Sequence, residues 1–204
     1  MNAIINKKIK FNATFDTIFK NVFKDPIIST ALINTILNSN YKPEDITYID
    51  TSQEIKNIKS KGVIFDINIQ TIDKLITLEM QRLKPDYDFK NRLLYYLMFN
   101  YSQTILKGDK YNTKDTILIC FTNFRFNNYK CVETFTMNNT LGTTFCGIKI
   151  VILDFTMAKF CDNIELKKWI YLIQCNDFID YKQGGNIAMD KFVDKVISMN
   201  NDSN

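Results

Sequence analysis

Histidine is missing from this sequence of 204 residues, and glycine and proline are scarce. Without histidine, the chain cannot use Ser-His-Asp or Cys-His relays, His-ligated zinc, or a histidine general base. Any acid–base or metal chemistry must come from carboxylates, amides, lysine or tyrosine. Only 6 glycines and 3 prolines occur, and no low-complexity segment or internal repeat interrupts the pattern. We therefore expect a single domain over residues 1–204.

The five cysteines form no metal or redox motif. The two closest, Cys120 and Cys131, are eleven positions apart, so no C-x-x-C pair exists. The longest apolar run, Leu93–Phe99, is far shorter than a membrane span, and residues 1–10 are basic without the apolar core of a signal peptide. We expect a cytoplasmic protein with no membrane partner, whose cysteines are reduced and act as small core residues.

The charge balance is mildly basic. With 26 Lys and Arg against 22 Asp and Glu, the net charge of +4 permits a polyanionic partner without requiring one. Three groups of lysines either contact DNA phosphates or form ordinary solvated surface. These groups are Lys7, Lys8 and Lys10; Lys56, Lys59 and Lys61; and Lys107, Lys110 and Lys114.

Apolar periodicity predicts helices and strands that alternate along the chain. The first helix spans residues 14–37 and is divided in two by Pro26. Strands are predicted at 46–49, 63–70, 75–81, 116–122, 130–137 and 147–155, and further helices at 88–106, 163–174 and 187–199. This order predicts an α/β fold with a mixed central β-sheet flanked by α-helices.

The predicted hairpin at residues 63–81 has one apolar and one polar face, because alternate residues of a strand point to opposite sides. The apolar face comprises Val63, Phe65, Ile67, Ile69, Ile76, Leu78 and Met80. The other face comprises Ile64, Asp66, Asn68, Gln70, Leu75, Thr77, Glu79 and Gln81. If Ile72 and Asp73 form a two-residue turn, Asp66 lies directly opposite Glu79.

Two carboxylates in opposite positions repel each other by about 4 kcal/mol at about 4 Å and an effective dielectric constant near 20. Solvent, a shared proton, a basic side chain or a divalent cation would offset this repulsion. Mg²⁺ prefers a few carboxylate oxygens plus water, which Asp66, Glu79 and the Met80 carbonyl would supply. Gln81, about 7 Å further along the strand, would orient an attacking water. The pattern fits either metal-assisted phosphodiester hydrolysis or a solvated acidic surface.

Several short motifs follow one another along residues 14–172. They are D-x-x-F-K at Asp16–Lys20, Phe65-Asp66, Leu78–Gln81, Arg92–Tyr96, Tyr101, Gly108, Tyr111, Lys159-Phe160 and the stretch Leu166–Trp169. In this order and spacing they resemble the PD-(D/E)XK nuclease superfamily, in particular its recombination-promoting nuclease and transposase branch.

The resemblance implies a restriction-endonuclease-like core with a mixed four-stranded sheet over about 14–172, and a C-terminal helical appendage over 173–204. It also implies a Mg²⁺-dependent DNA endonuclease, with Mn²⁺ as a substitute metal and a homodimer as one arrangement. Asp66 and Glu79 would be the metal carboxylates, and Gln81 takes the place of the usual lysine. Because glutamine lacks a positive charge, weakened cleavage or a DNA-binding remnant is the alternative. A purely structural interaction module is a third possibility.

Asp16, Lys20 and Arg92 are candidates for supporting or DNA-contacting roles. Asp16 and Lys20 share a helix face, where Asp16 alternatively complements the helix N-terminus and pairs with Lys20. Arg92 lies at the start of the helix after the hairpin, within reach of a phosphate or an active-site carboxylate. Its alternative partner is Asp88, one turn earlier.

Overall fold

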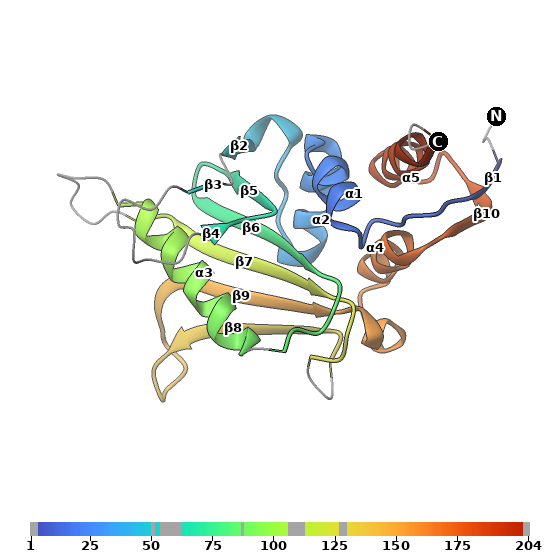
Figure 1. Ribbon diagram of the computed structural model, residues 1–204. Helices are drawn as coiled ribbons and strands as arrows, with labels where there is room; N and C mark the ends of the chain where they lie inside the picture. Colours follow the sequence, from blue (N-terminus) through green and yellow to red (C-terminus); the bar gives the residue numbers. More distant parts are fainter. Residues whose placement is uncertain are drawn as a thin grey trace. The chain divides into compact units, whose positions relative to one another are not determined.

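The computed structural model describes residues 4–49, 52–53, 63–86, 88–105, 113–126 and 130–201, arranged in two compact units (Figure 1). The first unit combines residues 1–44 with 157–204, and the second comprises residues 45–156. The chain passes between them within two short 3-10 helices, η1 (Pro43–Asp45) and η2 (Phe155–Phe160). Several residues singled out above lie outside the described residues: Lys56, Lys59, Lys61, Lys107, Gly108, Lys110 and Tyr111.

The first unit is mainly helical. Its helices are α1 (Asp16–Phe23), α2 (Pro26–Leu37), α4 (Ile164–Gln174) and α5 (Ile187–Asn201). Their apolar sides meet at Phe192, whose ring centroid lies 5.9 Å from that of Phe23 and 5.8 Å from that of Trp169. Two strands far apart in sequence, β1 (Ile4–Lys8) and β10 (Asp177–Lys182), pair antiparallel. This strand pair was not predicted from the sequence.

Pro26 divides the first predicted helix, as expected. It is the first residue of α2, where the missing proline N–H is not needed for an intrahelical bond. The Asp25 side chain caps α2 by accepting a hydrogen bond from the Ile27 N–H at 3.1 Å. Asn38, with φ of 52°, adopts the left-handed conformation that ends the helix.

Residues 173–204 supply β10 and α5, which are integrated into the first unit. On α5, Lys191 Nζ lies 2.8 Å from Asp25 Oδ2. The Tyr181 hydroxyl of β10 donates to Asp190 Oδ1 of α5 at 2.9 Å. The ion pair ties the C-terminal segment to the start of α2, and the Tyr181 bond joins β10 to α5. The single domain over residues 1–204 stays a prediction.

The second unit is built on a six-stranded sheet in the order β2-β5-β6-β7-β9-β8 (Figure 1). Its strands are β2 (Thr47–Ile49), β5 (Ile67–Gln70), β6 (Lys74–Gln81), β7 (Asp115–Thr122), β8 (Val132–Asn138) and β9 (Thr144–Asp154). A separate two-stranded pair joins β3 (Ser52–Gln53) to β4 (Val63–Ile64). The sheet has two more strands than the resemblance implied, because β2 and β8 extend its edges.

The sheet is mixed, as predicted. Strands β6, β7 and β9 are parallel neighbours, whereas β2, β5 and β8 each pair antiparallel. The carboxyl ends of β6, β7 and β9 therefore lie at one edge of the sheet. In open α/β sheets this edge is the usual location of a ligand site.

Helix α3 (Phe89–Gln103) covers one face of this sheet (Figure 1). Leu93 and Leu97 of α3 belong to one buried cluster with Leu118 and Cys120 of β7 and Ile152 of β9. The Asp88 side chain caps the helix by accepting from the Asn91 N–H at 3.2 Å. The side of the sheet that carries Thr77, Glu79 and Gln81 is therefore the side under α3, since Glu79 is the register partner of Cys120.

The turn of the hairpin and its register are confirmed. Ile67 lies opposite Leu78, and Gln70 lies opposite Leu75. The Thr71 N–H donates to the Lys74 carbonyl at 2.9 Å, which closes a turn with Ile72 and Asp73 at its tip.

The prediction of one unbroken strand over residues 63–70 is wrong. The strand is interrupted at Phe65 and Asp66, and β4 pairs with β3 instead of β6. The Phe65 ring lies against Tyr96 and Phe99 of α3, at centroid distances of 5.5 and 6.5 Å, so it does not share a face with the apolar residues of β5. Side-chain hydrogen bonds at Asp66 replace the backbone ladder here.

Candidate active site

The Asp66 and Glu79 carboxylates each accept a backbone hydrogen bond from across the hairpin. The Asp66 N–H donates to Glu79 Oε1 at 3.0 Å, and the Met80 N–H donates to Asp66 Oδ2 at 2.8 Å. Each carboxylate thus accepts a hydrogen bond from the opposite segment, beyond the last ladder pair of β5 and β6. The predicted juxtaposition of the two acids is therefore present, and these N–H dipoles offset part of their repulsion.

The two carboxylates differ in exposure. Glu79 is buried, with 6% of its surface accessible, whereas Asp66 is half-buried. Burial raises the pKa of the neighbouring Cys120 thiol well above its ordinary value; the Glu79 carboxylate adds to this rise, and the Arg92 guanidinium opposes it. A solvated acidic surface does not describe this pair, because charged groups are rarely buried without a specific partner.

The Met80 carbonyl is placed on the same side as the Asp66 carboxylate. The Met80 N–H points at Asp66. In an antiparallel arrangement the N–H and C=O of one residue point to the same neighbouring strand. Asp66, Glu79 and this carbonyl form an all-oxygen donor set that suits a hard cation which keeps several water ligands. Among the described residues, no group of three or more Asp, Glu, Cys or His side chains is placed to hold a metal.

Gln81, the last residue of β6, is oriented by two hydrogen bonds. Its Nε2 donates to the Leu83 carbonyl at 2.9 Å, and its Oε1 accepts from Arg92 Nη1 at 3.3 Å. An amide has two N–H donors and two acceptor lone pairs, so one of each remains for a water molecule.

Arg92 joins the site through the hydrogen bond of its guanidinium to Gln81. Its guanidinium carbon lies 4.9 Å from the centroid of the Tyr96 ring, so the guanidinium stacks on that ring. The Asp88 carboxylate instead accepts from the backbone and the side chain of Asn91. The structure thus brings Arg92 together with the hairpin residues.

Asp16 and Lys20 belong to the first unit and pair with each other. Lys20 Nζ lies 2.8 Å from Asp16 Oδ1, one turn apart on α1, and Asp16 is in the first helical turn. The predicted helix-stabilising pair is confirmed. A supporting or DNA-contacting role for these two residues stays a prediction.

Sequence reasoning missed one residue of the polar face, Asn100 of α3. Its Nδ2 donates to Thr77 Oγ1 at 2.6 Å and to Asn68 Oδ1 at 3.2 Å. These two partners are each two positions along the chain from one of the carboxylates. Asn100 follows Arg92 by eight positions and so lies on the same side of the helix, but a single buried amide leaves no periodic signal that identifies it.

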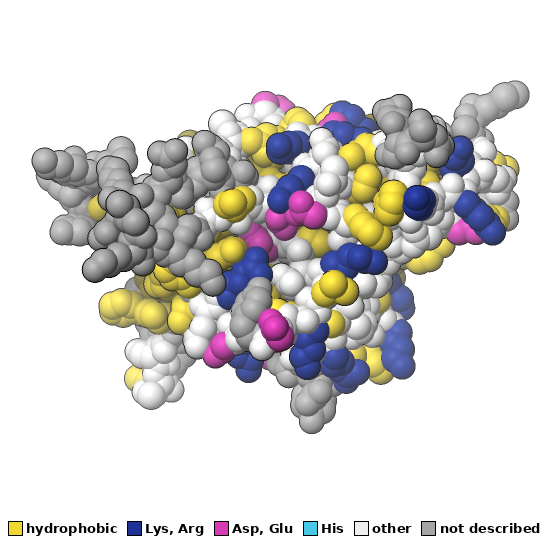
Figure 2. Space-filling view, viewed as in Figure 1, with side chains coloured by type: hydrophobic (Ala, Val, Ile, Leu, Met, Phe, Trp, Pro, Cys, Tyr) yellow, Lys and Arg dark blue, Asp and Glu magenta, His cyan; other side chains and the backbone are white. Residues whose placement is uncertain are grey.

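Basic and aromatic side chains line a pocket of about 280 Å³ at the loops that follow β6 and β7. Lys84, Lys90 and Arg125 contribute the positive charge, and Phe124 and Phe126 contribute rings. Figure 2 shows that, among the residues drawn in colour on this face, Lys and Arg side chains are interspersed with acidic and apolar ones. Positive charge therefore occurs in small groups and not as one large basic surface, which agrees with the small net charge.

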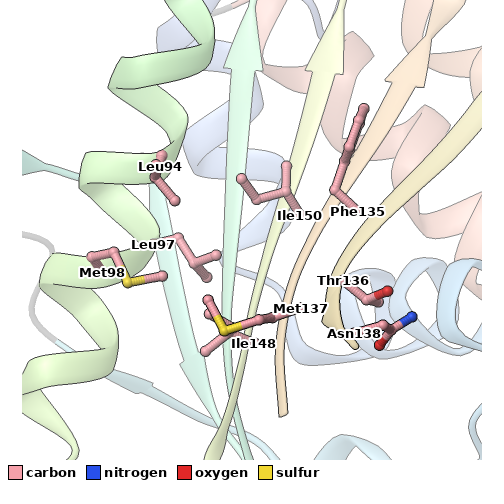
Figure 3. A pocket seen from close by; sticks show the side chains of 9 residues that line it. All are labelled: Leu94, Leu97, Met98, Phe135, Thr136, Met137, Asn138, Ile148 and Ile150. Carbon is pink, nitrogen blue, oxygen red and sulfur yellow. The ribbon is translucent and has the colours of Figure 1, made fainter. Parts of the chain in front are cut away.

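A larger cavity of about 360 Å³ lies between α3 and strands β8 and β9 (Figure 3). Its lining comprises Leu94, Leu97, Met98, Phe135, Thr136, Met137, Asn138, Ile148 and Ile150. None of these described residues is titratable, so the cavity offers no acid or base.

The described residues include no helix with the length and apolar character that crossing a membrane requires. No curated protein matches the chain. One family model matches residues 13–202, and its description is PD-(D/E)XK nuclease family transposase. This match confirms the suspected superfamily and the restriction-endonuclease-like fold. Because the match covers nearly the whole chain, the protein belongs to the PD-(D/E)XK nuclease family transposases.

Proposed function

We propose that this chain is a Mg²⁺-dependent DNA endonuclease of the mobile-element or recombination type, in which Asp66, Glu79 and Gln81 act together. The observation that carries the proposal is the pair of hydrogen bonds across the hairpin: Glu79 Oε1 accepts from the Asp66 N–H, and Asp66 Oδ2 accepts from the Met80 N–H. Membership in a nuclease family supports phosphodiester hydrolysis as the reaction. A cytoplasmic location and a homodimer stay predictions.

Asp66 and Glu79, with the Met80 carbonyl, would hold Mg²⁺ or Mn²⁺. When bound there, a divalent cation polarises a phosphoryl oxygen and favours the ionisation of a water molecule. The carboxylates need no rearrangement to serve as ligands, because backbone N–H groups of the opposite segment already fix them. Such preorganisation lowers the cost of reaching the transition state.

Gln81 would orient the attacking water through its remaining amide group, and Arg92 would supply the positive charge that glutamine lacks. The 3.3 Å contact between Arg92 Nη1 and Gln81 Oε1 supports this division of roles. A guanidinium stays charged at any physiological pH and binds phosphate oxygens in a planar fork. It therefore suits stabilisation of a charged phosphoryl group.

DNA is the proposed substrate. The pocket with Lys84, Lys90 and Arg125 lies in the loops next to Gln81, at the carboxyl edge of the parallel strands. Gln81 and Thr122 are register neighbours at the ends of β6 and β7, so a strand of DNA in this pocket would pass close to Gln81. Cationic side chains there would contact backbone phosphates.

A DNA-binding remnant without cleavage is the second candidate. Gln81 stands where the family resemblance implies a lysine. In addition, one donor and one acceptor of its amide are already used by Leu83 and Arg92, which favours this candidate. A remnant would bind DNA with a steep salt dependence and would not cut it.

Plasmid nicking separates the two candidates. We expect the wild-type chain to nick supercoiled DNA with Mg²⁺ or Mn²⁺ but not with EDTA. Asp66→Asn and Glu79→Gln should each lose this activity, while Glu44→Gln, an exposed carboxylate outside the site, should keep it. Nicking that persists in Asp66→Asn would remove the carboxylates from the mechanism, and binding without any nicking would favour the remnant.

A further inference from the structure

We infer that Asn100 is a positioning residue for Arg92. It forms a buried polar cluster with Asn68 and Thr77, and this cluster sets the position of α3 along β6, so that Arg92 meets Gln81 at the other end of the helix. The effect of Asn100 on catalysis rests on the proposed function. Its effect on the position of Arg92 rests on the contacts alone.

The three members of the cluster are almost completely buried. Asn68 has 0% of its surface accessible, and Thr77 and Asn100 have 1% each. The Thr77 hydroxyl donates to Asn68 Oδ1 at 2.7 Å, and Asn100 Nδ2 donates to both partners at 2.6 and 3.2 Å. These bonds connect α3 to both strands of the hairpin.

This polar cluster does not give the folded state the highest stability that the position allows. Within the part of the chain that the structure describes, Asn68 Nδ2 and Asn100 Oδ1 are buried without a hydrogen-bond partner. A buried amide group left unpaired costs free energy, and well-packed apolar side chains in its place would avoid that cost. What the polar cluster adds is direction, because hydrogen bonds fix a geometry that apolar contacts leave free.

Apolar packing alone fixes the position of a helix along a sheet less sharply than hydrogen bonds do. The buried cluster around Leu93, Leu97 and Cys120 holds α3 down on β7 and β9. Hydrophobic burial is proportional to area and has no preferred direction, so a small shift of the helix changes it little. A directional contact at each end is needed to fix the register of α3.

The spacing of the two end contacts supports this role. Asn100 and Arg92 are eight residues apart, which is about 12 Å along a helix at about 1.5 Å per residue. Their partners Thr77 and Gln81 are four residues apart, which is about 13 Å along a strand at about 3.3 Å per residue. The two spans match, so the contact of Asn100 with Thr77 leaves Arg92 at the level of Gln81.

Tyr96 lies between the two ends on the same side of α3. Its ring stacks under the Arg92 guanidinium at 4.9 Å and contacts the Phe65 ring at a centroid distance of 5.5 Å. Phe65 directly precedes Asp66, so the helix side formed by Arg92, Tyr96 and Asn100 follows the hairpin from Gln81 to Thr77.

The test reads the position of Arg92 directly by NMR. The chain has only three arginines, Arg82, Arg92 and Arg125, so three side-chain Nε–Hε signals are expected. Substitution of each arginine by lysine assigns them. The Arg92 signal should be displaced by the Tyr96 ring current, and this displacement should be lost in Asn100→Leu and in the nearly isosteric Thr77→Val.

Leu97→Ala is the matched control, because it destabilises the same helix without touching the polar cluster. It should leave the Arg92 signal in place. In cleavage assays, Thr77→Val should lower kcat by about 10- to 100-fold with little change in KM. This loss should disappear when Arg92 is already replaced by lysine.

The inference fails if folded Asn100→Leu or Thr77→Val keeps the displaced Arg92 signal. It also fails if Leu97→Ala abolishes that signal to the same extent, since general destabilisation would then explain the effect. Failure of the proposed function is a separate result, because a wild-type chain that does not cut DNA still shows the Arg92 signal.

Discussion

The buried thiol of Cys120 lies among the charged groups of the site. It is fully inaccessible and is the register neighbour of Glu79. Burial raises its pKa, the Glu79 and Asp66 carboxylates raise it further, and Arg92 lowers it. The thiol therefore stays protonated in the folded chain and is not a nucleophile.

This raised pKa makes the stability of the chain sensitive to alkaline pH. Above about pH 8.5 the unfolded state loses the Cys120 proton while the folded state keeps it, so the free energy of unfolding falls as pH rises. The loss grows as the pH rises further, and it is absent below the unfolded pKa. Urea unfolding of wild type and Cys120→Val at pH 7 and pH 10 measures this difference. Equal pH dependence of the two proteins would contradict the assignment.

The hairpin shows which parts of an element sequence can predict. Its turn, its register and the meeting of Asp66 with Glu79 follow from local alternation and a two-residue connection. The interruption at Phe65 does not, because it depends on side-chain hydrogen bonds of Asp66 and on rings of α3. Asn100 escaped prediction for the same reason: a single buried amide gives no periodic signal.

The start of α2 is stabilised by one carboxylate with two functions. Asp25 caps the helix through the Ile27 N–H, and its Oδ2 lies 2.8 Å from Lys191 and 4.0 Å from Lys195. Asp25→Ala removes the cap and leaves the two lysines of α5 to repel each other.

We expect Asp25→Ala to lower the free energy of unfolding by about 1 to 2 kcal/mol. Chemical denaturation measures it against Asp162→Ala, which replaces an exposed aspartate. If both variants unfold at the same denaturant concentration, neither the cap nor the ion pair contributes.

The division of the chain into two units was not predictable from local patterns. Strand β1 pairs with β10 across most of the sequence, with Ile4 opposite Lys182. Each of these strands is short, and a pairing between such distant segments leaves no trace in the periodicity of either one. The central sheet, in contrast, was predictable because its long apolar strands are buried and bounded by polar residues.

Charge near the carboxyl edge of the sheet should dominate DNA binding, since the net charge of the chain is only +4. We expect the double variant Lys84→Ala, Arg125→Ala to weaken binding. It should also reduce the slope of log affinity against log salt by about 1 for each phosphate that the variant no longer neutralises.

Fluorescence anisotropy with a labelled duplex at several salt concentrations measures this slope. Lys167→Ala, which removes an exposed lysine of α4 outside the pocket, serves as the control and should leave the slope close to that of wild type. An unchanged slope in the double variant would show that DNA does not use this pocket.

A crystal structure of the chain soaked in Mn²⁺ tests whether Asp66 and Glu79 share one divalent cation. We predict an anomalous difference peak coordinated by one oxygen of each carboxylate, and no such peak in Asp66→Asn crystals. Wild-type crystals with Mn²⁺ bound elsewhere, or with no peak between the two carboxylates, would contradict the account.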